Sequence, residues 1–336
     1  MLAELPTELK INILEHVDKT LPAVLRTNST FRGITEPILY SVVTLAPFLN
    51  NAKLYKIVIE CFRTMVARPS AAAAVRRLYV CLHCDTNHDP VTIGQVYGAF
   101  VDALAKLENL ERLELPFWDD RYYQYPIGLP RGSPLQSLQH YYGPPEVIDN
   151  IQSNVLATLR IKTCGPKAVE VSGALLAAAR YNAIALRALG IGREEHDDDE
   201  KWLEFIPQIP LLFPNIRFLD LGNWPTIDND LIDRLIPSLA LMENLRLLKL
   251  EGGWGTGQEW ERPYVKRLHE GCPHLRKISF GDGEWRFAEE VREWAPPPCA
   301  WEDDPRTDEI WSKNNHQYLV DPQMDGFDYE FIKYWM

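Results

Sequence analysis

A repeated Leu-x-x-Leu-x-Leu core constrains the fold of this chain more than any other feature. Its copies, in which Ile and Phe also occur, begin at Leu110, Leu156, Leu186, Ile216, Leu245 and Leu275. The middle positions of the last five copies follow one another at steps of 30, 30, 29 and 30 residues; they are Leu159, Leu189, Leu219, Leu248 and Ile278. Upstream copies centred on Leu78, Leu113 and Leu138 are less even, with steps of 35, 25 and 21 to the next centre. Regular steps of this length indicate stacked structural repeats.

Each copy predicts a short strand in which alternate side chains are buried. Between the strands, apolar residues recur at three- and four-residue steps, which predicts helices within residues 54–65, 93–104, 202–209 and 231–239. We therefore expect an α/β horseshoe with a parallel inner sheet and outer helices, stabilised by stacking. A doubly wound α/β domain also alternates strands and helices, but nothing in that fold requires a 30-residue step.

The repeats resemble the leucine-rich repeat family over about residues 75–282. Residues 4–45 resemble an F-box. The matching features are the Leu5-Pro6-Thr7-Glu8-Leu9 opening, the Ile13-Leu14 and Phe31-Arg32 pairs, and the Pro37-Ile38-Leu39-Tyr40 ending. Together the two halves are similar to F-box/leucine-rich repeat proteins of the fungal type. We expect a three-helix F-box-like module at 1–45, a repeat domain at 46–285 and a C-terminal linker and cap at 286–336.

This resemblance implies a non-catalytic substrate-recognition subunit of an SCF-type cullin–RING ubiquitin ligase. Such a chain docks on a ligase adaptor of the SKP family and holds a protein substrate. The adaptor-binding residues it implies are Leu5, Pro6, Leu9, Ile13, Leu14, Leu21, Leu25 and Phe31. In the alternative, the N-terminal helices only cap the stack, and the chain is a protein-interaction scaffold with no ligase.

Two groups of residues are candidates for holding the substrate. One lies between the buried strand positions and comprises Glu114, Arg160, Asp220 and Lys249. The other follows the strands by three to five residues and comprises Trp118, Trp224, Trp254 and Trp285. Exposed Trp beside acidic residues predicts a rim that binds a basic motif. In the alternative, the strand face is an ordinary solvated surface, and the rings cover the edge of the sheet.

Composition excludes several classes of partner. The chain has 47 acidic and 35 basic residues and a formal charge of −12, which argues against nucleic acid. No apolar stretch is long enough to cross a bilayer, and the first residues lack the pattern of a signal peptide. We therefore expect a cytoplasmic and/or nuclear protein whose six Cys are reduced.

Neither a metal site nor a cofactor site is expected. Cys81, His83, Cys84 and His88 cluster, but their spacing matches no usual zinc pattern. The glycine-rich segment 252–257 lacks the Gly-Lys-Ser/Thr ending of a phosphate loop and contains a bulky Trp254. No local signature of a catalytic Ser or Cys is present.

Overall fold

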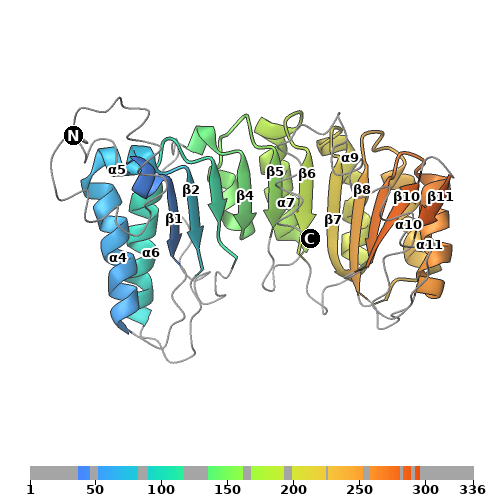
Figure 1. Cartoon of the computed structure of the whole chain (residues 1–336), viewed down its shortest axis with the longest axis horizontal. Helices are drawn as coiled ribbons and strands as arrows, with labels where there is room; N and C mark the ends of the chain where they lie inside the picture. The colour runs from blue at the N-terminus through green and yellow to red at the C-terminus, as the bar shows by residue number, and fades with distance from the viewer. Residues whose placement is uncertain are drawn as a thin grey trace, which may run out of the picture. The chain divides into compact units, whose positions relative to one another are not determined.

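The structure is a computed structural model that describes residues 37–45, 52–81, 90–116, 135–161, 168–192, 199–224, 226–252, 258–280, 283–288 and 292–295. The chain divides into two compact units, unit 1 (residues 1–216) and unit 2 (residues 217–336). Figure 1 shows the strands and helices of each unit.

Unit 1 contains six described strands that follow one another in the sheet in chain order, all parallel. They are β1 (Val42–Leu45), β2 (Arg77–Val80), β3 (Arg112–Glu114), β4 (His140–Gly143), β5 (Thr158–Ile161) and β6 (Ala188–Ile191). Its helices are α4 (Ala52–Ala67), α5 (Pro69–Ala74), α6 (Pro90–Leu104), α7 (Ala168–Asn182), α8 (Asp199–Phe205) and α9 (Ile209–Leu212). Short 3-10 helices are η4 (Leu135–Ser137), η5 (Pro145–Asn150) and η6 (Ile206–Gln208).

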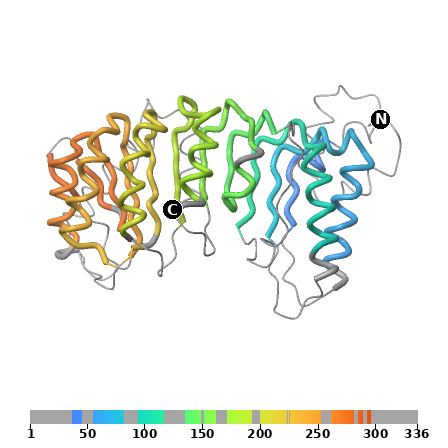
Figure 2. Tube along the Cα trace, turned by 180° about the vertical axis from the view of Figure 1, so that it is seen from behind, coloured from blue at the N-terminus to red at the C-terminus, as the bar shows by residue number. Residues whose placement is uncertain are grey.

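Unit 2 contains three parallel strands, β7 (Phe218–Trp224), β8 (Leu247–Gly252) and β9 (Lys277–Phe280). Helices α10 (Asn229–Leu239) and α11 (Gln258–Gly271) connect them. The chain then reverses: β10 (Gly283–Ala288) pairs antiparallel with β9, and β11 (Glu293–Ala295) pairs antiparallel with β10. This hairpin crosses the predicted boundary between the repeat domain (46–285) and the C-terminal linker and cap (286–336). Within each unit the helices lie on one face of the sheet, as the front and back views show (Figures 1 and 2).

The leucine repeat defines the core, and the mixed α/β structure is compatible with the predicted α/β repeat. The six residues that open the copies, from Leu110 to Leu275, are at most 1% exposed. The middle positions of the regular copies are fully buried, and their partners in the next strand are also middle positions, as in Leu159 opposite Leu189 and Leu248 opposite Ile278. A doubly wound sheet reverses its strand order at one point. The strand order within each unit is sequential, which excludes that alternative for the described strands.

Helix α4 packs on α6 through Phe62 and Phe100, whose ring centroids lie 5.5 Å apart. The predicted helices at 54–65, 93–104 and 231–239 are confirmed, and 202–209 falls within the run α8–η6–α9. Ile57 on α4 fits the apolar spacing of this helix but is 60% exposed.

One repeat centre was assigned wrongly from the sequence. The residue aligned with Leu113 and Leu159 is Tyr141, not Leu138. Tyr141 is 2% exposed and donates its hydroxyl to the Pro144 carbonyl at 2.6 Å. The step from β4 to β5 is only 18 residues, as the His140–Thr158 pair shows, so the connection has room for η5 rather than a full helix.

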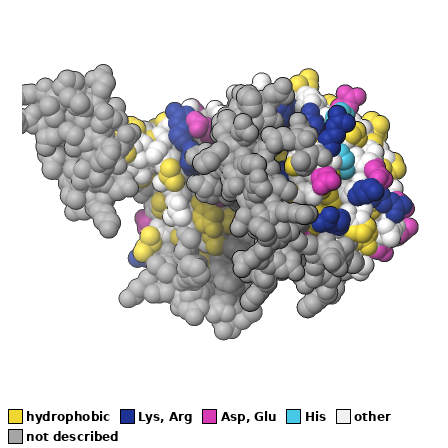
Figure 3. Space-filling model, turned by 45° about the vertical axis from the view of Figure 1, so that its right-hand side comes forward, with side chains coloured by type: hydrophobic (Ala, Val, Ile, Leu, Met, Phe, Trp, Pro, Cys, Tyr) yellow, Lys and Arg dark blue, Asp and Glu magenta, His cyan; other side chains and the backbone are white. Residues whose placement is uncertain are grey.

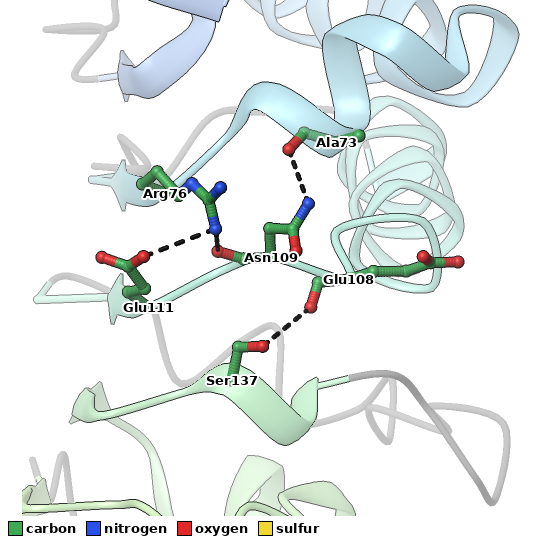
Figure 4. A network of polar contacts seen from close by, with 6 residues as sticks. All are labelled: Ala73, Arg76, Glu108, Asn109, Glu111 and Ser137. Atoms are coloured by element: carbon green, nitrogen blue, oxygen red, sulfur yellow. Dashed lines mark hydrogen bonds and ion pairs between the residues drawn. The ribbon is translucent and has the colours of Figure 1, made fainter.

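Polar side chains at the start of a repeat bind backbone carbonyls of a neighbouring repeat. Asn109 Nδ2 donates to the Ala73 carbonyl at 2.8 Å, and Arg76 donates to the Asn109 carbonyl at 3.3 Å while pairing with Glu111 at 3.4 Å (Figure 4). The same link recurs as Ser137 Oγ to the Glu108 carbonyl at 3.2 Å and Asn215 Nδ2 to the Ile184 carbonyl at 3.1 Å. These hydrogen bonds link each repeat to its neighbour in the stack.

We expect Asn109→Ala to destabilise unit 1 by about 0.5–1.5 kcal/mol, because it removes a hydrogen bond between two repeats. Chemical denaturation followed by far-UV circular dichroism measures the change. Asn215→Ala removes the equivalent bond and should have a similar effect. Unchanged stability in both variants would show that these bonds do not contribute to stacking.

Gly252 ends β8 with φ of +140°, opposite Trp224 of β7. A Cβ at this position would overlap the Trp224 carbonyl oxygen. We therefore expect Gly252→Ala to destabilise unit 2 by about 2–4 kcal/mol. Gly98 provides the contrast. It is exposed within α6, and a Cβ added there would meet no heavy atom within 4 Å. There Gly→Ala should stabilise by about 0.5–1 kcal/mol. Thermal unfolding of both variants checks the opposite signs.

Candidate protein-interaction surface

The strand face of unit 1 is the face whose side chains alternate with the buried leucines. The strand pairing places Arg77, Arg112 and His140 in one row across β2, β3 and β4. The next row along the strands holds Tyr79, Glu114, Tyr142 and Arg160, from β2 to β5. Arg77 is exposed and the other six side chains are half-buried. Ala188 and Gly190, which continue the rows on β6, are buried.

Neighbouring side chains on this face are paired. Arg112 Nε forms an ion pair with Glu114. The Arg160 guanidinium lies over the Tyr142 ring, with Cζ 5.1 Å from the centroid. Burial is the main cause that raises the pKa of Tyr79, with Cys81 and Glu114 adding to it, so the phenol stays protonated as a hydrogen-bond donor. Glu114 and Arg160 thus occupy the strand-face positions that the sequence predicted for them.

His140 stands in the first row, on β4 beside Arg112. Its Nδ1 is 2.7 Å from Thr158 Oγ1 on the adjacent strand. Burial, together with the positive charges of Arg112 and Arg77, lowers the pKa of His140 to about 4. The imidazole is therefore neutral at physiological pH, and the positive charge of this face comes from its arginines.

The strand face of unit 2 carries Lys249, as predicted, and Lys249 Nζ pairs with Glu251 Oε1 at 2.5 Å. Asp220 was predicted to face solvent in the same row, but it is 2% exposed, and its Oδ1 accepts a hydrogen bond from the Gly222 amide at 3.0 Å. Asp220 therefore shapes the irregular end of β7, where the pairing with β8 shifts register. On the face shown in Figure 3, Lys and Arg side chains lie interspersed with Asp and Glu.

The two tryptophans of the predicted rim that the structure describes lie in the interior. Trp224 is 2% exposed within β7, and Trp285 is fully buried within β10, where its Nε1 donates to Glu261 Oε2 at 2.6 Å. The expectation that their rings are exposed is wrong, because both residues belong to strands rather than to the loops that follow them. Trp118 and Trp254 lie outside the described residues.

The predicted adaptor-binding residues also lie outside the described part of the chain. They are Leu5, Pro6, Leu9, Ile13, Leu14, Leu21, Leu25 and Phe31. Their docking role therefore stays a prediction.

Within the described residues, no group of three or more His, Cys, Asp or Glu side chains is placed to hold a metal ion. Of the Cys81–His88 cluster only Cys81 is described, and like Cys61 and Cys272 it is not part of a disulfide in the described residues. Burial raises the pKa of Cys272 to about 11, which keeps that thiol protonated and unreactive. None of the described helices has the length and apolarity required to cross a bilayer.

Comparison with solved structures gives several matches, and one of them is a weak structural likeness. No protein-family model matches the chain, and no curated protein matches it. A crystal structure of a Bacteroides fragilis protein aligns with 64% of this chain and 68% of its own, at a TM-score of 0.35 and 11% sequence identity. A likeness of that size assigns neither family nor activity to this chain.

Proposed function

We propose that this chain is a non-catalytic substrate-recognition subunit of an SCF-type cullin–RING ubiquitin ligase. The observation that carries the proposal is the repeat sheet with one strand face left partly exposed. The described helices cover the opposite face (Figures 1 and 2). The strand face presents charged and aromatic side chains such as Arg77, Tyr79 and Arg160. A rigid sheet with such a row of side chains suits protein recognition.

The N-terminal sequence supports the ligase part of the proposal. The Leu5-to-Leu9 opening and the Ile13-Leu14 pair stand directly before the repeats, in the order found in F-box proteins with leucine-rich repeats. In this arrangement one end of the chain binds the adaptor and the repeats hold the substrate. The chain itself makes no bond; it raises the local concentration of a substrate lysine near the ubiquitin-charged enzyme.

Affinity purification of the full chain from cells tests this assignment. We expect an SKP-type adaptor and a cullin to be recovered together with the chain. Recovery of other proteins with neither adaptor nor cullin would instead support the scaffold alternative, in which the N-terminal helices only cap the repeats.

A further inference from the structure

Strand β11 is short and lies at the edge of the described sheet of unit 2 (Figure 1). It spans the three residues Glu293–Ala295 and pairs with β10 through three residue pairs. Arg292, directly before it, has φ of 55°, a left-handed conformation that is unfavourable for a residue with a side chain. Backbone pairing along so short a strand is weak, so the position of β11 also depends on side-chain contacts.

A cluster of three rings provides such contacts between β11, β10 and α11. Phe287 and Trp294 stand opposite each other in the β10–β11 pairing, and their ring centroids lie 5.5 Å apart. The imidazole centroid of His269, on α11, is 4.3 Å from that of Phe287 and 5.5 Å from that of Trp294. All three side chains are half-buried. The imidazole therefore joins both strands of the hairpin to the helix.

The cluster accommodates a neutral imidazole better than an imidazolium. The Nδ1 atom of His269 is buried, and no described residue forms a hydrogen bond with it. Both ring nitrogens of an imidazolium carry a proton, so protonation would make Nδ1 a buried donor without a described acceptor. It would also add a positive charge near Arg276, whose Cζ lies 5.6 Å from the Phe287 centroid.

Two described charges act on the imidazole. Burial, and then the positive charge of Arg276, lower the pKa of His269 below its ordinary value of 6.5, against a raising by Glu270. The attraction of a cation to aromatic faces therefore does not compensate for burial here. Arg267, also on α11, is turned toward α10, where it pairs with Asp233 at 2.5 Å.

The charged residues of the hairpin flank the rings without facing them. Arg286 precedes Phe287, and Glu293 precedes Trp294. Because side chains alternate along a strand, Arg286 and Glu293 lie on the opposite face of the sheet from the rings. Glu289 and Glu290, in the connection between the two strands, lie outside the described residues.

We propose that His269 is a pH-sensitive switch whose neutral imidazole holds β11 and the end of β10 on α11, and whose protonation favours release of β11. In the open form the imidazole regains its ordinary pKa of 6.5 and binds a proton more readily than in the closed form. The stabilisation of the closed form is therefore fully present above pH 6.5 and is lost as pH falls below it. This inference does not rest on the proposed function.

Amide hydrogen exchange of the full chain, measured by mass spectrometry and corrected for the intrinsic effect of pH, tests the proposal. We expect the protection of residues 285–295 to fall at least about threefold between about pH 7.5 and pH 5.5, since one proton changes the opening equilibrium by up to about tenfold per pH unit. Protection of β8, which lies between β7 and β9, should stay constant. Equal protection of 285–295 at both pH values would overturn the proposal.

Two substitutions assign the effect to His269. His269→Phe keeps a ring in the cluster but cannot titrate, so the protection of residues 285–295 should no longer depend on pH in this range. His274→Gln removes an exposed histidine and should retain the fall seen in the wild type. Persistence of the fall in His269→Phe, or its disappearance in His274→Gln, would contradict the role of His269.

An NMR titration of the wild-type imidazole protons gives a readout that needs no substitution. The pKa of His269 should lie below 6.5, and a value at or above 6.5 would overturn the proposal. Glu261→Gln separates this switch from the buried carboxyl of Glu261, whose raised pKa gives the opposite dependence of stability on pH. The fall in protection on acidification should persist in Glu261→Gln, and its loss there would show that His269 is not its source.

Discussion

Replacing Trp285 with Ala is expected to destabilise unit 2 by about 3–5 kcal/mol. Trp285 is fully buried in β10, opposite Ile278 of β9, and Arg262 lies over its ring with Cζ 5.8 Å from the centroid. The truncation removes the ring and leaves a cavity, and it also removes the hydrogen-bond donor to Glu261, which is 8% exposed. Urea denaturation followed by far-UV circular dichroism measures the loss.

Two further variants separate the ring from the hydrogen bond. Trp285→Phe keeps most of the packing but leaves the Glu261 carboxylate without that donor, so we expect a smaller loss of about 1–3 kcal/mol.

Burial raises the pKa of Glu261 above its ordinary value of 4.5, against a smaller lowering by the Trp285 hydrogen bond. The folded state therefore holds this proton more tightly, and stability falls as pH rises from 4.5 through the raised pKa. Glu261→Gln should remove that fall. If the stability of Glu261→Gln falls over the same pH range as that of the wild type, the account is contradicted.

Charged replacement of Leu9 and Ile13 is expected to abolish adaptor binding, a loss of at least about 100-fold. Both residues belong to the predicted docking set, and Leu9→Glu/Ile13→Glu would place two carboxylates in an apolar interface without partners. Ile57→Glu is the matched control, because Ile57 is 60% exposed on α4 and its replacement adds a charge without entering a core. Co-purification of each full-length variant with the adaptor provides the measurement.

If the Leu9/Ile13 variant binds the adaptor as well as the wild type does, the docking residues are assigned wrongly. If Ile57→Glu loses binding equally, the effect reflects charge or folding rather than docking. The circular dichroism of the repeats should be the same in all three proteins.

The spacing of leucines and other apolar residues was sufficient to predict the parallel sheet and most helices, because the buried positions of these elements recur at regular intervals in the sequence. Leu248 and Ile278 pair as the 30-residue step requires. Helix α7 was not predicted, although Val171, Leu175 and Ala178 follow a helical spacing and are buried. Its alanine-rich sequence gives only a weak contrast between its two faces.

Other features depended on particular side-chain contacts, which the spacing of apolar residues does not reveal. Tyr141 replaces a leucine in the core only because its hydroxyl reaches the Pro144 carbonyl. Trp285 was taken for an interface residue, yet its position is decided by Glu261, 24 residues upstream on α11. The basic strand face was visible as separate residues, but only the pairing of β2 with β3, β4 and β5 shows which of them are neighbours.

Calorimetric titration of the purified full chain with a purified SKP-type adaptor tests the central assignment most directly. We expect saturable one-to-one binding by the wild-type chain and none by Leu9→Glu/Ile13→Glu. A folded wild-type chain that releases no heat at adaptor concentrations of about 0.1 mM would contradict the assignment as a ligase receptor.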